Sequence, residues 1–180
     1  MAIKQLNCQY MPQEDRLLFR LNTDNGCDYP FLLTRRITLF ILSATERLVV
    51  QRLATSHEAP VAKAINQFEG EAARETVQFH DQYEIGSSFP LGEAPLLVRD
   101  ASCKVQFQDG KTIVYLDFLL GDDKTIGLQL WGSVYQNMRI LLGRMVEQAL
   151  WLDSSSEERN KTQSEEFESS PNASGVIPIH

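Results

Sequence analysis

Residues 16–36 contain four arginines, and their predicted placement suggests that they bind an anion. Two of them follow each other at the predicted start of a helix, in Leu33-Thr34-Arg35-Arg36. The helix macrodipole favours acids there by about 0.3 to 1 kcal/mol per charge, so this placement opposes the local preference. Guanidinium groups beside free backbone N–H groups would bind a carboxylate or a phosphate. Two further arginines lie on the outward face of the second predicted strand, so the candidate set is Arg16, Arg20, Arg35 and Arg36.

The same arginines also allow a purely structural interpretation. Ion pairs with Glu14, with Asp28 or with a helix over 58–79 would satisfy them inside the chain, and so would pairs across a dimer. The sequence favours this interpretation and leaves the anion site as the alternative.

Other reactive residue types lack the spacing that catalysis or metal binding needs. None of the three histidines has a second His or a Cys at helical ligand spacing, and the three cysteines form no CxxC pair. The phosphate-binding patterns GxxxxGK[ST] and GxGxxG and the nucleophile pattern GxSxG are all missing. We therefore expect no catalytic residues, no metal and no cofactor. Cys8 and Cys103 fall on inward strand positions and are expected to pack in the core.

Composition indicates a soluble globular protein. The chain has 180 residues, of which 43% are hydrophobic and 23% charged, with a formal net charge of −7. No apolar stretch approaches the roughly 18 to 20 residues that span a bilayer, and residues 1–7 lack the apolar segment of a signal peptide. An odd number of scattered cysteines fits reduced thiols. We expect a cytoplasmic protein that binds neither membranes nor nucleic acid.

Much of the negative charge lies near the C-terminus. Residues 153–180 contain six acids and two bases, so the body before them carries only −3. This region is rich in Ser and Glu and lacks apolar periodicity. We predict a single α+β domain over 1–152 and a disordered acidic tail over 153–180.

Apolar residues alternate with polar ones in three successive segments, which is typical of half-buried strands. Their inward positions are Leu6, Cys8, Tyr10, Leu17, Phe19, Leu21, Tyr29, Phe31 and Leu33. Adding 97 to each number gives nine apolar residues again. Helical periodicity follows both sets, over 34–54 and 133–152, with Thr34 and Ser133 as the predicted N-caps.

This pattern predicts an α+β fold made of two β-β-β-α units, 1–54 and 95–152, joined by a connecting helix over 58–79. Helices would pack against antiparallel sheet, and the six strands could form one sheet or two. The repeat suggests an internal duplication, although alternating strands also match one another by chance.

The beginning of the chain resembles a known family. The run EDRLLFRLNT at 14–23, followed by YPFLLTRR at 29–36, is similar to the opening of an uncharacterised family of small proteobacterial proteins with an LRLNT…LTRR pattern. The similarity covers about the first 40 residues. It implies a bacterial cytosolic origin and supplies no activity, ligand or catalytic residue.

Two functional hypotheses follow. The first is a non-enzymatic binding or protein-interaction module of unknown partner, with a homodimer as one form it could take. The second is a small anion-binding protein or enzyme that uses the arginine cluster at the helix N-terminus.

Overall fold

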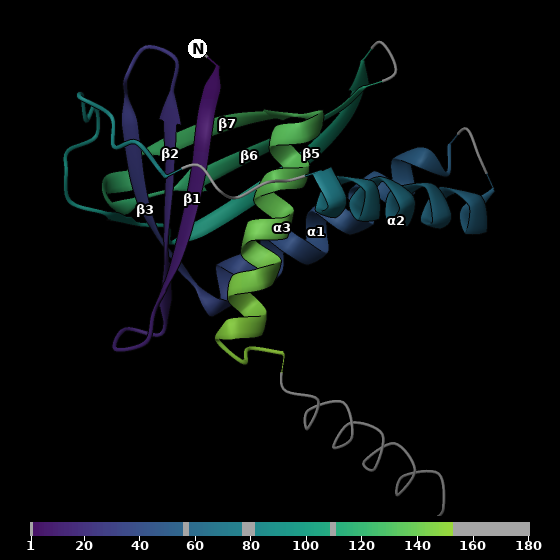
Figure 1. The fold of residues 1–180 in the computed structure, drawn as a ribbon, viewed down its shortest axis with the longest axis horizontal. Coiled ribbons are helices and arrows are strands. Elements are labelled where there is room, and N and C mark those ends of the chain that lie inside the picture. Colours follow the sequence, from purple (N-terminus) through teal and green to yellow (C-terminus); the bar gives the residue numbers. More distant parts are fainter. Residues whose placement is uncertain (1, 56–57, 77–81, 109–110, 153–180) are drawn as a thin grey trace, which may run out of the picture.

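The computed structural model describes residues 2–55, 58–76, 82–108 and 111–152, and it confirms the predicted α+β class. The first half contains three strands and two helices (Figure 1). They are β1 (Ile3–Met11), β2 (Arg16–Thr23), β3 (Asp28–Thr34), α1 (Arg35–Leu53) and α2 (Ala59–Thr76). The second half contains β4 (Leu96–Leu97), β5 (Asp100–Gln108), β6 (Lys111–Leu119), the short 3-10 helix η1 (Gly121–Asp123), β7 (Thr125–Trp131) and α3 (Gly132–Gln148). The predicted tail, 153–180, lies outside the described residues.

The strands form two sheets, which answers the question that the sequence left open. One sheet has the order β1-β2-β3-β4, and the other has the order β5-β6-β7. Neighbouring strands within β1-β2-β3 and within β5-β6-β7 are antiparallel. Strand β4 instead pairs in parallel with β3, and Leu96 lies opposite Phe31. This parallel pair was not predicted from the sequence, because a strand of two residues has no alternation to read.

The bounds of the two halves correspond closely. Strand β1 covers 3–11 and β5 covers 100–108, while β3 covers 28–34 and β7 covers 125–131, each bound 97 higher. Equal element order does not by itself show common origin, so the duplication stays a prediction. The end of the predicted connecting helix, 77–79, lies outside the described residues.

The helix ends agree only in part with the prediction. Thr34 is the N-cap of α1, and its hydroxyl accepts a 3.4 Å hydrogen bond from the N–H of Ile37. Ser133 is not a cap: α3 begins at Gly132, with Trp131 at the N-cap position and no side-chain hydrogen bond there. At its other end α3 stops at Gln148, before the predicted 152, because Leu150 adopts a left-handed φ of 54° and ends the helix.

Helices α1 and α3 each pack against strands of both units. Helix α1 lies chiefly against β5 of the second unit, whereas α3 lies against β1 of the first unit and also against β6 and β7 of its own, so the two units interlock (Figure 1). One hydrophobic cluster contains buried residues of both sheets, and within it the rings of Phe31 and Phe118 meet edge to face at 5.3 Å. A sequence pattern identifies which face of a helix is apolar but not which sheet receives it.

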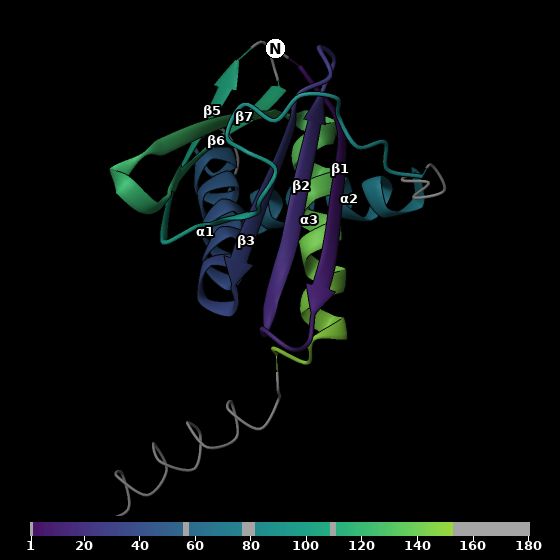
Figure 2. The ribbon, with the colours of Figure 1, turned by 90° about the vertical axis from the view of Figure 1, so that its left-hand side faces the viewer.

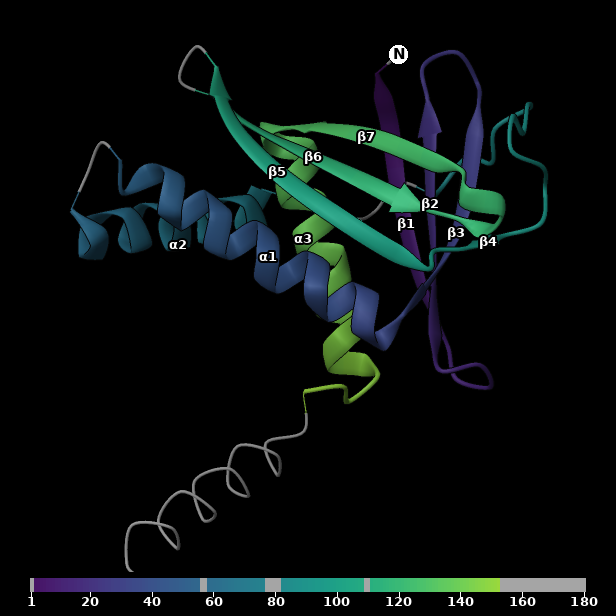
Figure 3. The same ribbon diagram turned by 180° about the vertical axis from the view of Figure 1, so that it is seen from behind.

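Helix α2 runs back alongside α1 and extends away from the first sheet (Figure 3). It contacts α1 and, less extensively, α3. Of the helices in the described ranges, none is long and apolar enough to cross a membrane.

The described part of the connection between α2 and β5, residues 82–99, crosses the outer face of the first sheet (Figure 2). It is anchored near the β2–β3 turn, where the N–H of Asp28 donates to the carbonyl of Ser88 at 2.8 Å. It then follows the β3 edge through β4 and enters β5. We call residues 89–95, the part between these two anchors, the strap.

Candidate functional site

The structure separates the four predicted arginines into two places. Arg16 pairs with Thr34, the residue before Arg35, so Arg16, Arg35 and Arg36 all lie near the start of α1. Arg20 lies farther along β2, opposite Pro30. The single basic zone of four side chains is therefore not assembled around one point.

Each of these guanidinium groups binds a group of the same chain. Arg16 lies 3.3 Å from the Glu14 carboxylate, as the structural interpretation predicted. Arg35 donates to the carbonyl oxygen of Trp151 at 2.6 Å. Arg36 donates to the carbonyl of Arg99 at 2.7 Å and lies 3.6 Å from the Asp100 carboxylate. Anion binding by the arginines stays a prediction, and it would compete with these contacts.

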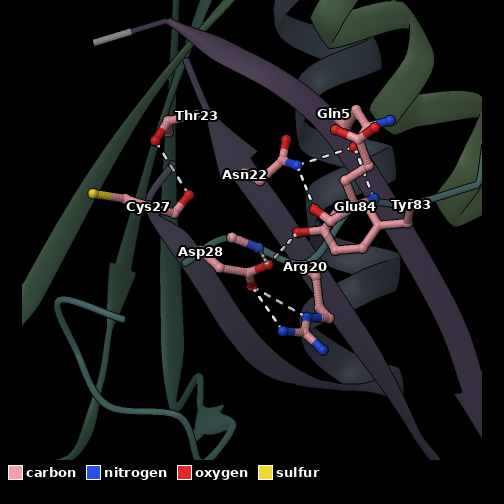
Figure 4. A network of polar contacts seen from close by, with 9 residues as sticks. Gln5, Arg20, Asn22, Thr23, Cys27, Asp28, Tyr83 and Glu84 are labelled. Carbon is pink, nitrogen blue, oxygen red and sulfur yellow. Dashed lines mark hydrogen bonds and ion pairs between the residues drawn. The ribbon is translucent and has the colours of Figure 1, made fainter. Parts of the chain in front are cut away.

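Arg20 belongs to a buried network centred on Asp28 (Figure 4). The side chain of Asp28 is fully buried, and its Oδ1 accepts from Nε and Nη2 of Arg20 at 3.1 and 3.0 Å. Its Oδ2 accepts from the Tyr83 hydroxyl at 2.9 Å and from the N–H of Gly86 at 3.0 Å. Four donors thus satisfy both carboxylate oxygens. The Arg20 guanidinium also lies 5.6 Å from the centre of the Tyr83 ring.

The network continues through amides toward β1. Asn22 donates from Nδ2 to Oε1 of Gln5 at 3.0 Å and to the carbonyl of Glu84 at 2.7 Å. The same Gln5 oxygen accepts from the N–H of Glu84 at 3.0 Å. Burial and the nearby Asp28 carboxylate raise the pKa of the Tyr83 phenol, so it stays a neutral donor. These contacts fasten residues 83–86 to the sheet, so the network acts as an internal clamp.

An open cavity of about 710 Å³ lies beside α2, and we call it the α2 groove. Its wall is largely apolar and includes Leu53, Ile65, Phe68 and Phe107, which come from α1, α2 and β5. Phe68 is 72% exposed although it belongs to the apolar stripe of its helix. The α2 groove is thus formed by α1 and α2 together with β5, β6 and the start of α3, which come from the second half of the chain.

Cations outnumber acids among the described residues that line the α2 groove. Arg52 and Lys111 line it, with Glu69 as the one acid among its lining residues in the described chain. The N-terminus of α3 reaches it at Gly132, and the first turn of this 17-residue helix has neither an acidic residue nor a side-chain cap. Free N–H groups at a helix N-terminus attract negative charge.

Two further residues of α3 line the α2 groove with buried polar atoms. Gln136 is 9% exposed, and its Oε1 has no hydrogen-bond partner within the described ranges. Tyr135 is fully buried, and its hydroxyl has no hydrogen bond of good geometry there either. Burial raises the pKa of the Tyr135 phenol against opposing effects of Thr45 and Arg139, so the phenol remains protonated.

The sequence did not predict the α2 groove. Helical periodicity of apolar residues over 58–79 is typical of a stripe that packs in the core, and it does not show that part of the stripe stays exposed. The hairpin of β5 and β6 and the start of α3 form the other walls, and nothing in the sequence near α2 identifies them. A weak signal was present in the first turn of α3, which carries no acid.

Among the residues that the structure describes, no three His, Cys, Asp or Glu side chains come together as metal ligands would. The resemblance to a proteobacterial family stays a prediction. No model of a known protein family matches this chain, and comparisons with curated proteins and with solved structures find no match either.

Proposed function

We propose that this protein is a non-enzymatic interaction module that binds an acidic segment of a partner protein in the α2 groove. The observation that carries this proposal is Phe68, a large aromatic side chain that is 72% exposed on the wall of a 710 Å³ cavity. Aromatic side chains exposed beside a cavity are the usual anchors of protein interfaces.

The extent of the apolar surface favours a polypeptide over a small molecule. Val61, Ile65 and Phe68 follow one another at helical spacing on α2, and Val61 is also exposed although it does not line the cavity. The apolar stripe therefore continues beyond the cavity. A groove beside such a stripe suits a helical or extended segment with apolar anchors.

Charge favours an acidic segment. Among the residues that the structure describes, the lining contributes two cations, one acid and the uncapped N-terminus of α3. A carboxylate of the partner would find complementary charge near Lys111 and Gly132, while an apolar neighbour packs against Phe68. The three free thiols are compatible with the cytoplasmic location that we propose for this module.

The arginine hypothesis has less support. The guanidinium groups of Arg16, Arg20, Arg35 and Arg36 all bind groups of their own chain. An anion would have to displace Asp28 from Arg20, and that carboxylate is fully buried with four hydrogen bonds.

Selection from a random peptide library displayed on phage tests the proposal on the full chain. We expect enriched peptides to combine Asp or Glu with Leu, Ile or Phe. Phe68→Asp should weaken their binding at least about a hundredfold, as loss of an anchor residue does. Lys111→Glu should weaken it at least about tenfold and reduce its salt dependence. The control Phe40→Asp changes a 38% exposed residue of α1 outside the α2 groove and should have little effect.

Three results would contradict the proposal. They are no enrichment, enrichment that is indifferent to Phe68, and enrichment of basic peptides. Light scattering adds a further check. If the protein is a dimer that Phe68→Asp converts to a monomer, the occupant of the α2 groove is a second copy of this chain.

A further inference from the structure

A second cavity lies between the two sheets, and we call it the inter-sheet cavity. Its volume is about 510 Å³. The first sheet contributes Ile3, Leu21 and Tyr29, and β7 contributes residues 125–129. The strap contributes Pro90 and Leu91 to the lining of this open cavity. It shares no lining residue with the α2 groove.

Within the described ranges, the lining of the inter-sheet cavity carries no Asp, Glu, Lys, Arg or His, and Tyr29, Thr125 and Gln129 are its polar residues. Leu21, Ile126 and Leu128 present hydrocarbon, and burial together with the neighbouring Cys27 raises the pKa of the Tyr29 phenol, which therefore stays neutral. A charged ligand would lose its hydration here without gaining a counter-charge. The volume falls within the range of about 300 to 1,000 Å³ that is common for small-molecule sites.

The strap is held at its ends and has little bonding in between. Before it, Asp28 Oδ2 accepts from the N–H of Gly86, and the carbonyl of Ser88 accepts from the N–H of Asp28. After it, the N–H of Val98 donates to the carbonyl of Leu32 at 3.0 Å.

Within the strap, the one backbone hydrogen bond among the described contacts runs from the N–H of Gly92 to the carbonyl of Phe89, at 3.0 Å. Gly92 has a φ of 97°, and no atom lies within 4 Å of where its Cβ would be. The wall is thus a turn between two fixed points, in which Pro90 is exposed and Leu91 is half-buried against the hydrophobic core. Such a turn can move outward without breaking either anchor.

We propose that the inter-sheet cavity is a binding site for a neutral, largely hydrocarbon small molecule, which enters past the strap. The apolar and uncharged lining selects against ions, and the volume sets the size of the ligand. This site is independent of the α2 groove, so either proposal can fail without the other.

Titration of the full chain with N-phenylnaphthylamine, a neutral apolar fluorophore, tests the site. We expect saturable binding of one molecule per chain with increased fluorescence. Leu91→Phe and Ile126→Phe place extra carbon in the cavity, and each should weaken binding at least about tenfold. The control Leu97→Phe makes the same change on β4, outside the lining, and should bind as the wild type does.

Phe68→Asp distinguishes the two sites, because it alters the α2 groove and should leave probe binding unchanged. The inter-sheet proposal is wrong if the wild type shows no saturable binding, if Phe68→Asp abolishes it, or if both folded cavity variants bind normally. Circular dichroism checks that these variants fold. If neither cavity variant folds, the amide chemical shifts of the wild type are measured with and without the probe. The probe must change the shifts of Ile126, Gly127 and Leu128, and changes confined to other residues overturn the proposal.

Discussion

The indole Nε1 of Trp151 donates a 2.7 Å hydrogen bond to Oδ1 of Asp15, a residue 136 positions earlier in the chain. The hydroxyl of Tyr10 donates to the same oxygen at 3.0 Å, and its ring meets the indole edge-on at 5.9 Å. Asp15 occupies the turn between β1 and β2 with a left-handed φ of 49°. The end of the second unit is therefore fastened to the first hairpin of the chain.

This contact should contribute measurably to stability. Trp151→Phe keeps an aromatic ring in a buried position but removes the donor, so we expect a loss of about 2 kcal/mol in the free energy of unfolding. Urea unfolding followed by circular dichroism measures it. In the Asp15→Ala background the same substitution should cost clearly less, and equal costs in the two backgrounds would show that the hydrogen bond contributes nothing.

Replacing Leu150, just after the C-terminus of α3, by glycine should stabilise the protein. Leu150 has a φ of 54° and is 76% exposed, while the N–H of Trp151 donates to the carbonyl of Val146 in a Schellman arrangement. A leucine is strained at this φ, so Leu150→Gly should stabilise the protein by about 0.5 to 1 kcal/mol. Thermal unfolding measures the gain. Leu152→Gly, at an exposed residue without a positive φ, is the control and should give none.

Asp28 should be among the most sensitive polar positions of the chain. Asp28→Asn removes the buried charge that pairs with Arg20 and replaces an acceptor oxygen by a donor, and we expect a loss of about 3 kcal/mol. Chemical denaturation tests this loss. Glu14→Gln removes the exposed partner of Arg16 and should change stability by less than about 0.5 kcal/mol. Similar effects of the two substitutions would mean that the clamp is not a stability determinant.

Much of the fold could be predicted from the sequence because strands and helices leave local patterns. The alternation around Leu17, Phe19 and Leu21 identified β2, and all three side chains are buried. The packing of α1 against β5 and of α3 against β1 could not be predicted, because it depends on contacts between residues far apart in the chain. The two-residue strand β4 is too short for any periodicity.

The binding surfaces were less predictable for the same reason. Arg20 and Asp28 were recognised as a possible ion pair, but their partners Tyr83 and Gly86 lie in a connection without periodicity. The α2 groove and the inter-sheet cavity are each lined by elements from both halves of the chain. Sequence patterns indicate that a residue is apolar, and only the packing determines whether a cavity remains beside it.

Cys8 and Cys103 should react more slowly with alkylating agents in the native protein than in the unfolded protein. Burial raises the pKa of the Cys8 thiol to about 12 and that of Cys103 to about 11, from an ordinary value of 9.0. At pH 8 the thiolate fraction of Cys8 is then about a thousandfold below that of an unperturbed thiol. We expect a short iodoacetamide pulse to leave Cys8 and Cys103 unmodified in the native protein and to modify them in urea, as judged by peptide mass spectrometry. Rapid native labelling of Cys8 would contradict its burial.

Asn66 gives the most direct test of how α2 packs against α1 and α3. This residue is fully buried, and neither its Oδ1 nor its Nδ2 has a hydrogen-bond partner in the part of the chain that the structure describes. An unpaired buried amide costs about 1 to 3 kcal/mol, and leucine is also the better helix former. Asn66→Leu should therefore stabilise the protein by about 2 kcal/mol in urea unfolding. Gln67→Leu makes a similar change at an exposed neighbour and should stay within about 0.5 kcal/mol of the wild type. A loss of stability in Asn66→Leu would mean that the amide is bonded in solution and that α2 lies differently against α1.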